Sequence, residues 1–136
     1  MSTVFKSPAE VEDAYYDAID ECDLDKMMST WADSPEVVCL LPMQPMHHGR
    51  DAIKEMWKPM LDPELKVEIT INHLQWTEAG DITIHLLEEM VTLTGSGQRQ
   101  PPIYATNIYR RSGDGWHLLM HINAPTPLPP PPGMLP

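Results

Sequence analysis

The sequence has 136 residues, with 20 acidic and 9 basic side chains and a formal net charge of −11. A chain of this length builds one hydrophobic core, and its negative field repels nucleic acids and anionic membrane surfaces. No apolar run approaches the roughly 20 residues of a membrane span, and residues 1–6 lack a secretory pattern. We expect one soluble, cytoplasmic domain over residues 1–124, with neither nucleic acid nor a membrane as a partner.

Three helices are predicted in the first half of the chain. Ser7, Pro8 and Glu10 form a helix start, because Ser caps, Pro suits the first helical position and Glu the third. An apolar stripe then recurs at helical spacing and predicts a helix over 8–21. Asp23 caps a second, short helix, and a third begins near Arg50 and ends near Leu61.

The second half alternates with a period of two, which is typical of strands. We predict a short strand at 36–41, then long strands at 65–77, 81–94, 103–111 and 115–123, with tight turns at 79–81 and 112–115. Residues 42–48 and 95–102 are expected to be loops. Helices followed by strands predict a segregated α+β fold.

Residues 125–136 are expected to form a separate proline-rich tail. Four consecutive prolines at 129–132 favour an extended or disordered segment, or a strap over a second subunit. A proline-rich ligand for another domain is the alternative.

Four segments resemble the nuclear-transport-factor-2-like superfamily and, within it, the ketosteroid-isomerase and SnoaL-like branch. They are residues 14–19 with 23–25, residues 31–33, residues 48–53 with Trp57, and residues 107–111 with Gly115 and Trp116. The resemblance covers residues 8–124. It implies a cone-shaped NTF2-like (cystatin-like) fold, in which three N-terminal helices pack on a curved antiparallel sheet.

The resemblance also implies a conical pocket for a small hydrophobic molecule and a homodimer formed through the outer face of the sheet. The pocket wall is expected to comprise Trp31, Cys39, Met56, Trp57, Met60, Met120 and Ile122. Simple alternation on the last strand favours the face of Trp116, Leu118, Met120 and Ile122 as pocket wall, and leaves His121 and Asn123 on the other.

Ketosteroid isomerases use a carboxylate base and two hydrogen-bond donors to an enolate oxygen. The resemblance places the donors at Tyr15 and Asn107, and the base near Cys39. A buried thiol is a poor base because burial raises its pKa, so we predict no ordinary ketosteroid isomerase activity. Replacement bases that remain open are His85, Glu88, Glu89, His47 and His48.

Each candidate also has a plain structural interpretation: Tyr15 as a core tyrosine and Cys39 as a small core hydrophobe. No cofactor motif is found, and adjacent His47 and His48 offer too few ligands for a metal site, so neither a cofactor nor a metal is expected. Two functions stay open: an enzyme or binding protein for a small hydrophobic molecule, with isomerase- or cyclase-type proton transfer, and a non-catalytic dimerisation or protein-interaction module.

Overall fold

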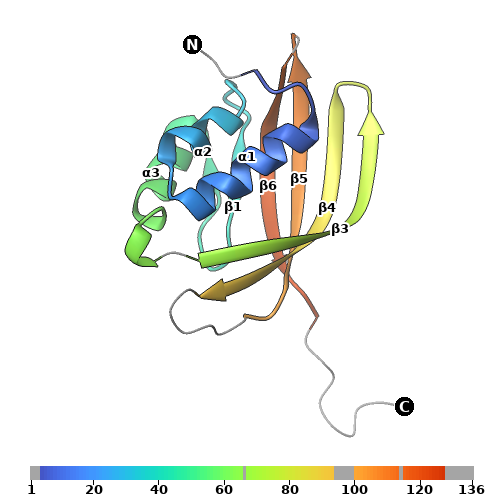
Figure 1. Cartoon of the computed structure of the whole chain (residues 1–136). Helices are drawn as coiled ribbons and strands as arrows, with labels where there is room; N and C mark the ends of the chain where they lie inside the picture. Colours follow the sequence, from blue (N-terminus) through green and yellow to red (C-terminus); the bar gives the residue numbers. More distant parts are fainter. Residues whose placement is uncertain (1–3, 66, 94–99, 114, 128–136) are drawn as a thin grey trace, which may run out of the picture.

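A computed structural model describes residues 4–65, 67–93, 100–113 and 115–127. Three helices lie on one face of a twisted sheet (Figure 1). They are α1 (Pro8–Glu21), α2 (Leu24–Thr30) and α3 (Arg50–Met60), and a 3-10 turn, η1, follows at Pro63–Leu65. The predicted helix caps are confirmed: Ser7 Oγ accepts from Glu10 N and Asp23 Oδ1 accepts from Lys26 N.

The sheet has six strands in the order β2-β1-β6-β5-β4-β3. Their bounds are β1 (Val38–Leu40), β2 (His47–His48), β3 (Val67–Ala79), β4 (Ile82–Leu93), β5 (Ile103–Ser112) and β6 (Gly115–Pro125). All neighbours pair antiparallel except β1 and β6, which run parallel. The α+β, helices-first architecture is confirmed, while the all-antiparallel sheet is corrected to a mixed one.

Two further sequence predictions differ from the structure. His47 and His48 form the short strand β2 beside β1, where a loop was expected. Strand β6 continues beyond the predicted end at residue 123, through Ala124 and Pro125, which pair with Tyr104 and Ile103, so Pro125 of the expected tail belongs to the sheet. Most of the expected 95–102 loop, and the tail from residue 128 onward, lie outside the described residues.

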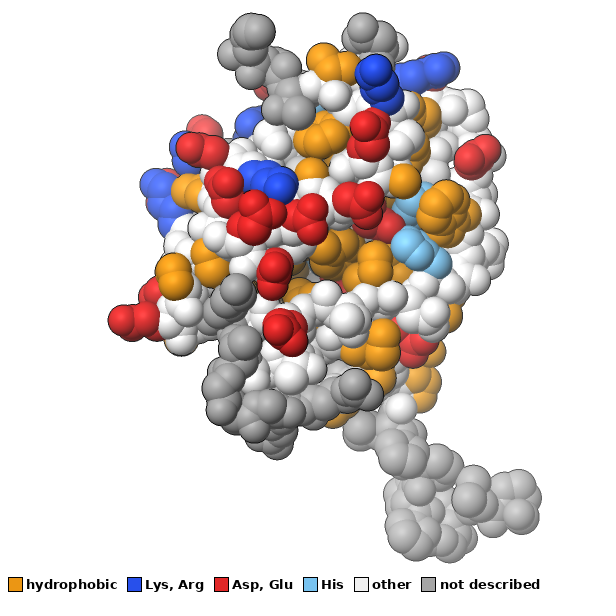
Figure 2. All heavy atoms as spheres, in the orientation of Figure 1, with side chains coloured by type: hydrophobic (Ala, Val, Ile, Leu, Met, Phe, Trp, Pro, Cys, Tyr) orange, Lys and Arg blue, Asp and Glu red, His pale blue; other side chains and the backbone are white. Residues whose placement is uncertain are grey.

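The hydrophobic core lies between the helices and the face of the sheet that they cover, called the inner face here. Its largest fully buried side chains include Tyr15, Met27, Trp31, Ile53 and Leu118. Acidic side chains gather on the solvent side of the helical layer, as Figure 2 shows; on α1 the exposed ones are Glu10, Asp13, Asp17, Asp20 and Glu21. No helix among the described residues is long and apolar enough to cross a membrane.

Candidate functional site

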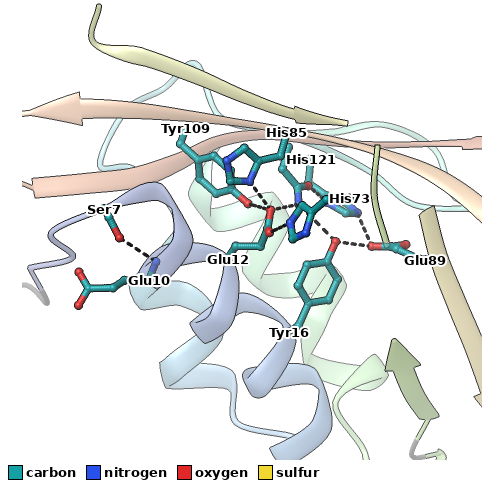
Figure 3. Close-up of polar contacts among 10 residues, drawn as sticks. Ser7, Glu10, Glu12, Tyr16, His73, His85, Glu89, Tyr109 and His121 are labelled. Carbon is teal, nitrogen blue, oxygen red and sulfur yellow. Dashed lines mark hydrogen bonds and ion pairs between the residues drawn. The ribbon is translucent and has the colours of Figure 1, made fainter. Parts of the chain in front are cut away.

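A buried carboxylate, that of Glu12, lies between α1 and the inner face of the sheet (Figure 3). It accepts hydrogen bonds from His73 Nε2, from His85 Nδ1 at 2.8 Å, from Tyr109 Oη at 2.5 Å and from Asn107 Nδ2 at 3.3 Å. The four donors come from β3, β4 and β5. Only 2% of Glu12 is exposed, so the carboxylate depends on these donors in place of water.

The donors decide the charge of Glu12. Burial by itself would raise its pKa, but hydrogen bonds from His85, Tyr109 and His73 outweigh burial and lower the pKa from 4.5 to about 2. Burial also holds the pKa of Tyr109 well above 10, so this hydroxyl keeps the proton that it donates. Glu12 is therefore a buried anion at neutral pH.

A second buried carboxyl group belongs to Glu89 on β4. Tyr16 Oη donates to its Oε2 at 2.7 Å, and Asn123 Nδ2 donates to its Oε1 at 2.8 Å. His121 Nε2 lies 3.8 Å from Oε2. Burial raises the pKa of Tyr16 well above its ordinary value, which keeps this hydroxyl a donor.

Asn107 connects the two centres. Its Nδ2 donates to Glu12 and to Tyr16 Oη at 3.3 Å, which directs its Oδ1 at His121 Nδ1, 2.5 Å away. Asn123 Nδ2 donates to Glu89 and to the carbonyl of Tyr104, which directs its Oδ1 at His121 Nε2, 3.0 Å away. Both ring nitrogens of His121 thus face side-chain amide oxygens, which hold the ring beside the Glu89 carboxyl group.

The Glu89 centre forms one wall of a pocket of about 310 Å³. Its polar members are Glu89, His121, Asn123 and the hydroxyl-bearing Tyr15. The other lining residues are apolar: Ile19, Leu41, Pro42, Trp57, Met60, Leu65, Val67, Ile69, Val91 and Ile103. An apolar cavity of this size with a few polar groups is typical of small-molecule sites.

The expected site residues fall into three groups. Tyr15, Trp57 and Met60 line the pocket. Trp31, Cys39 and Met56 are buried in the core and are absent from its lining. Asn107, expected to bind a ligand directly, is also absent from the lining; its side chain is occupied by His121, Glu12 and Tyr16. It can position His121, and of the two expected donors Tyr15 is the one that lines the pocket.

The prediction that Met120 and Ile122 line the pocket is wrong, because both side chains lie on the face of the sheet away from the helices. Ile108 pairs with Met120 but Tyr109 pairs with Leu118, so Leu119 is an extra residue in β6. Such a β-bulge interrupts the alternation of side chains. Leu118 faces the core and is absent from the pocket lining, and beyond the bulge His121 and Asn123 face the pocket.

Cys39 behaves as the sequence suggested. It is fully buried, and burial followed by the nearby charge of Glu89 raises the pKa of its thiol to about 12. A protonated thiol cannot accept a proton at neutral pH. Of the replacement bases considered, Glu89 is the one that lines the pocket, whereas Glu88 points to the opposite side and accepts from Asn72.

Sequence reasoning missed Glu12, His73 and His121 as parts of one network. A usable signal was present for Glu12, which lies three, four and seven positions before Tyr15, Tyr16 and Ile19 and so shares their helix face. Its contacts, however, join residues 61 to 97 positions apart, a separation that no local pattern reveals.

A family model described as a SnoaL-like domain matches residues 9–126. The chain belongs to the SnoaL-like family. The predicted resemblance is thereby confirmed, and no match is found among curated proteins.

Solved structures of the same fold are similar to this chain. One, described as a putative calcium/calmodulin-dependent protein kinase type II association domain from Thiobacillus denitrificans, is 31% identical with a TM-score of 0.85, covering 92% of this chain and 99% of that one. Another, described as a putative dehydratase from the NTF2-like family from Streptomyces avermitilis, is 23% identical with a TM-score of 0.76, covering 88% and 94%. The second shows the fold alone.

Proposed function

We propose that this protein binds a small hydrophobic carbonyl compound in the pocket beside Glu89 and catalyses an isomerase-type proton transfer on it. The observation that carries the proposal is a carboxyl group in the wall of an otherwise largely apolar cavity, with His121 3.8 Å away. Sequence reasoning lacked a positioned base, and Glu89 supplies one.

The pocket chemistry favours a ligand with an apolar body and an oxygen at one end. Trp57, Met60 and Ile69 surround the apolar part, and methionine adapts to irregular shapes. Burial raises the pKa of Tyr15 well above 10, so its hydroxyl stays protonated and can donate to the ligand oxygen.

The proposed step balances without a co-reactant. Glu89 removes a proton from the carbon beside the carbonyl, the C–H electrons form a carbon–carbon double bond, and the carbonyl electrons move to oxygen. Tyr15 stabilises that oxygen by donating a hydrogen bond. In a β,γ-unsaturated carbonyl compound the resulting dienolate carries electron density on the γ carbon, so Glu89 can return the proton there; the carbonyl re-forms, the carbon–carbon double bond shifts to the α,β position and the product is an isomer.

Thermal shift and turnover assays against steroids, phenols and polyketide-like aromatics test this proposal. Glu89→Gln should retain ligand binding and lower kcat by about 10²–10⁴-fold, and Tyr15→Phe should lower it by about 10²-fold. Glu88→Gln is the matched control, because that neighbouring carboxyl lies on the opposite side of β4. Equal turnover in Glu89→Gln and the wild type would refute the role of Glu89.

A second candidate function is self-association through the outer face of the sheet, the face away from the helices. Apolar side chains of β4, β5 and β6 lie side by side there: Ile84, Leu86, Tyr104, Ile108, Met120 and Ile122. Leu86 is 37% and Tyr104 39% exposed. A covering second copy would remove this surface from water, and the 31% identical relative is described as an association domain.

Light scattering tests the homodimer. Leu86→Glu should convert a dimer into monomers because it introduces a charge into the apolar patch. Met43→Glu, at a fully exposed loop position, should leave the dimer intact. A monomeric wild type, or dissociation by both variants alike, would contradict the proposed interface.

A further inference from the structure

We propose that Glu12, His73 and His85 form a binding site for a divalent first-row transition ion, with Zn²⁺ as the natural test ion. This site is separate from the pocket, because none of its three residues belongs to the pocket lining. Asn107 connects the two through hydrogen bonds to Glu12 and His121.

The geometry of the three side chains supports this site. Each can offer one ligand atom, and these atoms all lie within 4.8 Å of one another. Two imidazole nitrogens and a carboxylate oxygen are the ligand set of many zinc and non-haem iron sites. A tetrahedral ion with bonds of about 2.1 Å holds its ligands about 3.4 Å apart. Binding would therefore replace the present hydrogen bonds: the 2.8 Å between His85 Nδ1 and Glu12 Oε2 would widen by about 0.6 Å, while any separation near 4.8 Å would shorten.

The charge of the cluster favours a cation. Glu12 is a buried anion, and the ion pairs of the described residues give it histidines but neither lysine nor arginine. A buried carboxylate without a lysine or arginine partner is costly, and a dication would neutralise it. The exposed carboxylates of Asp13 and Asp17 on the same helix add a negative field at the entrance.

The surroundings suit a metal site with one open side. His85 is completely buried and stacks on Trp76 with ring centroids 4.1 Å apart, whereas 35% of the His73 side chain is exposed. Figure 2 shows histidine atoms at this surface, beside acidic side chains. Ions can therefore enter past His73, and water can complete the coordination.

Neighbouring groups would hold the ligands in place. Tyr109 Oη and Asn107 Nδ2 both donate to Glu12 Oε2, so they can orient the carboxylate after the histidines have turned from donors into ligands. His85 Nε2 is buried without a hydrogen-bond partner, so no second bond fixes the proton on Nδ1. The proton can move to Nε2 and free Nδ1 for a metal.

Calorimetric titration of the tag-free, EDTA-treated full chain with ZnCl₂ tests the proposal, supported by Co²⁺ absorption spectra. We expect one ion per chain with micromolar or tighter affinity, and no comparable binding of Mg²⁺, because imidazole ligands disfavour it. His73→Ala should weaken Zn²⁺ binding by more than about 100-fold. His48→Ala removes an exposed histidine outside the cluster and should leave the affinity unchanged.

Several outcomes would overturn the site. They are a wild type that binds neither Zn²⁺ nor Co²⁺, an unchanged affinity in His73→Ala, and an equal loss in His48→Ala. Because a variant can fail to fold, X-ray absorption of the Zn²⁺-loaded wild type gives an independent measurement. Two imidazole ligands and an oxygen ligand are expected, and a coordination shell without imidazole would refute the proposal.

Discussion

Two buried carboxyl groups lie on the same side of the sheet, and their surroundings differ. Glu12 accepts four hydrogen bonds, from two histidines, a tyrosine and an asparagine, whereas Glu89 accepts two and lines the apolar pocket. A carboxylate has about four positions at which it can accept hydrogen bonds. Glu12 therefore has none to spare for an organic ligand, while Glu89 can accept a further proton or hydrogen bond. The contrast separates a group that stabilises the fold from one that is available for chemistry.

The largest expected effect comes from removing the charge of Glu12. Glu12→Gln should lower the free energy of unfolding by about 4 kcal/mol, because it replaces a buried anion with an amide and leaves donors unpaired. Urea unfolding at pH 7 measures this loss. Glu10→Gln, two positions earlier and exposed, should cost less than about 1 kcal/mol. Equal losses in the two variants would remove the distinction drawn for Glu12.

Protonation of Glu12 should account for part of the stability that the protein loses in acid. Its pKa is about 2 in the folded chain and about 4.5 when exposed, so the unfolded chain binds more protons between these values. The contribution is fully present above about pH 4.5 and is lost as the pH falls toward 2, about 3 kcal/mol in all. Urea unfolding at a series of pH values should show this decline in the wild type and a shallower one in Glu12→Gln. Parallel curves would contradict the lowered pKa.

Glu89→Gln should have the opposite balance, with a small effect on stability and a large one on turnover. The amide retains one acceptor oxygen for Tyr16 or Asn123, so the free energy of unfolding should fall by only about 1–2 kcal/mol. The same urea assay provides the comparison. A loss as large as that of Glu12→Gln would show that both carboxyl groups are primarily structural.

Tyr16→Phe tests a single hydrogen bond of the Glu89 centre, because the Tyr16 hydroxyl donates to Glu89 and accepts from Asn107. Its removal should cost about 1 kcal/mol. In a double-mutant cycle with Glu89→Gln, the stability loss of the double variant should be smaller than the sum of the two single losses by about 0.5 kcal/mol, because both substitutions remove the same bond. Full additivity would mean that the Tyr16–Glu89 bond contributes nothing to stability.

Much of the fold was predictable because its signals are local. Ser7 and Asp23 indicate helix starts because each side chain accepts a hydrogen bond from the backbone N–H three residues later. The long strands β3 and β4 follow from alternation and the turn at Ala79–Asp81. The parallel pairing of β1 with β6 was not predictable in this way, since it joins segments about 80 residues apart and leaves no mark on the sequence of either strand.

The site was harder to predict for two physical reasons. The Glu12 cluster is assembled from α1, β3, β4 and β5, so each member looks like an ordinary surface or strand residue within its own segment. The assignment of His121 and Asn123 failed because strict alternation was continued through β6. The extra residue Leu119 has an apolar side chain like its neighbour Leu118, and nothing in its identity indicates a bulge.

Because of that single extra residue, the number of residues in β6 decides which of its side chains face the pocket. Deleting Leu119 would restore uninterrupted alternation, so that one end of the strand would have to rotate by half a turn. If the half held by the core at Leu118 stayed in place, Met120 and Ile122 would enter the cavity, and His121 and Asn123 would move to the opposite surface. A one-residue insertion or deletion between positions 118 and 120 would thus replace the polar wall of the pocket with an apolar one without altering any other amino acid. In comparisons of related sequences, a gap in this strand is therefore as informative as a substitution.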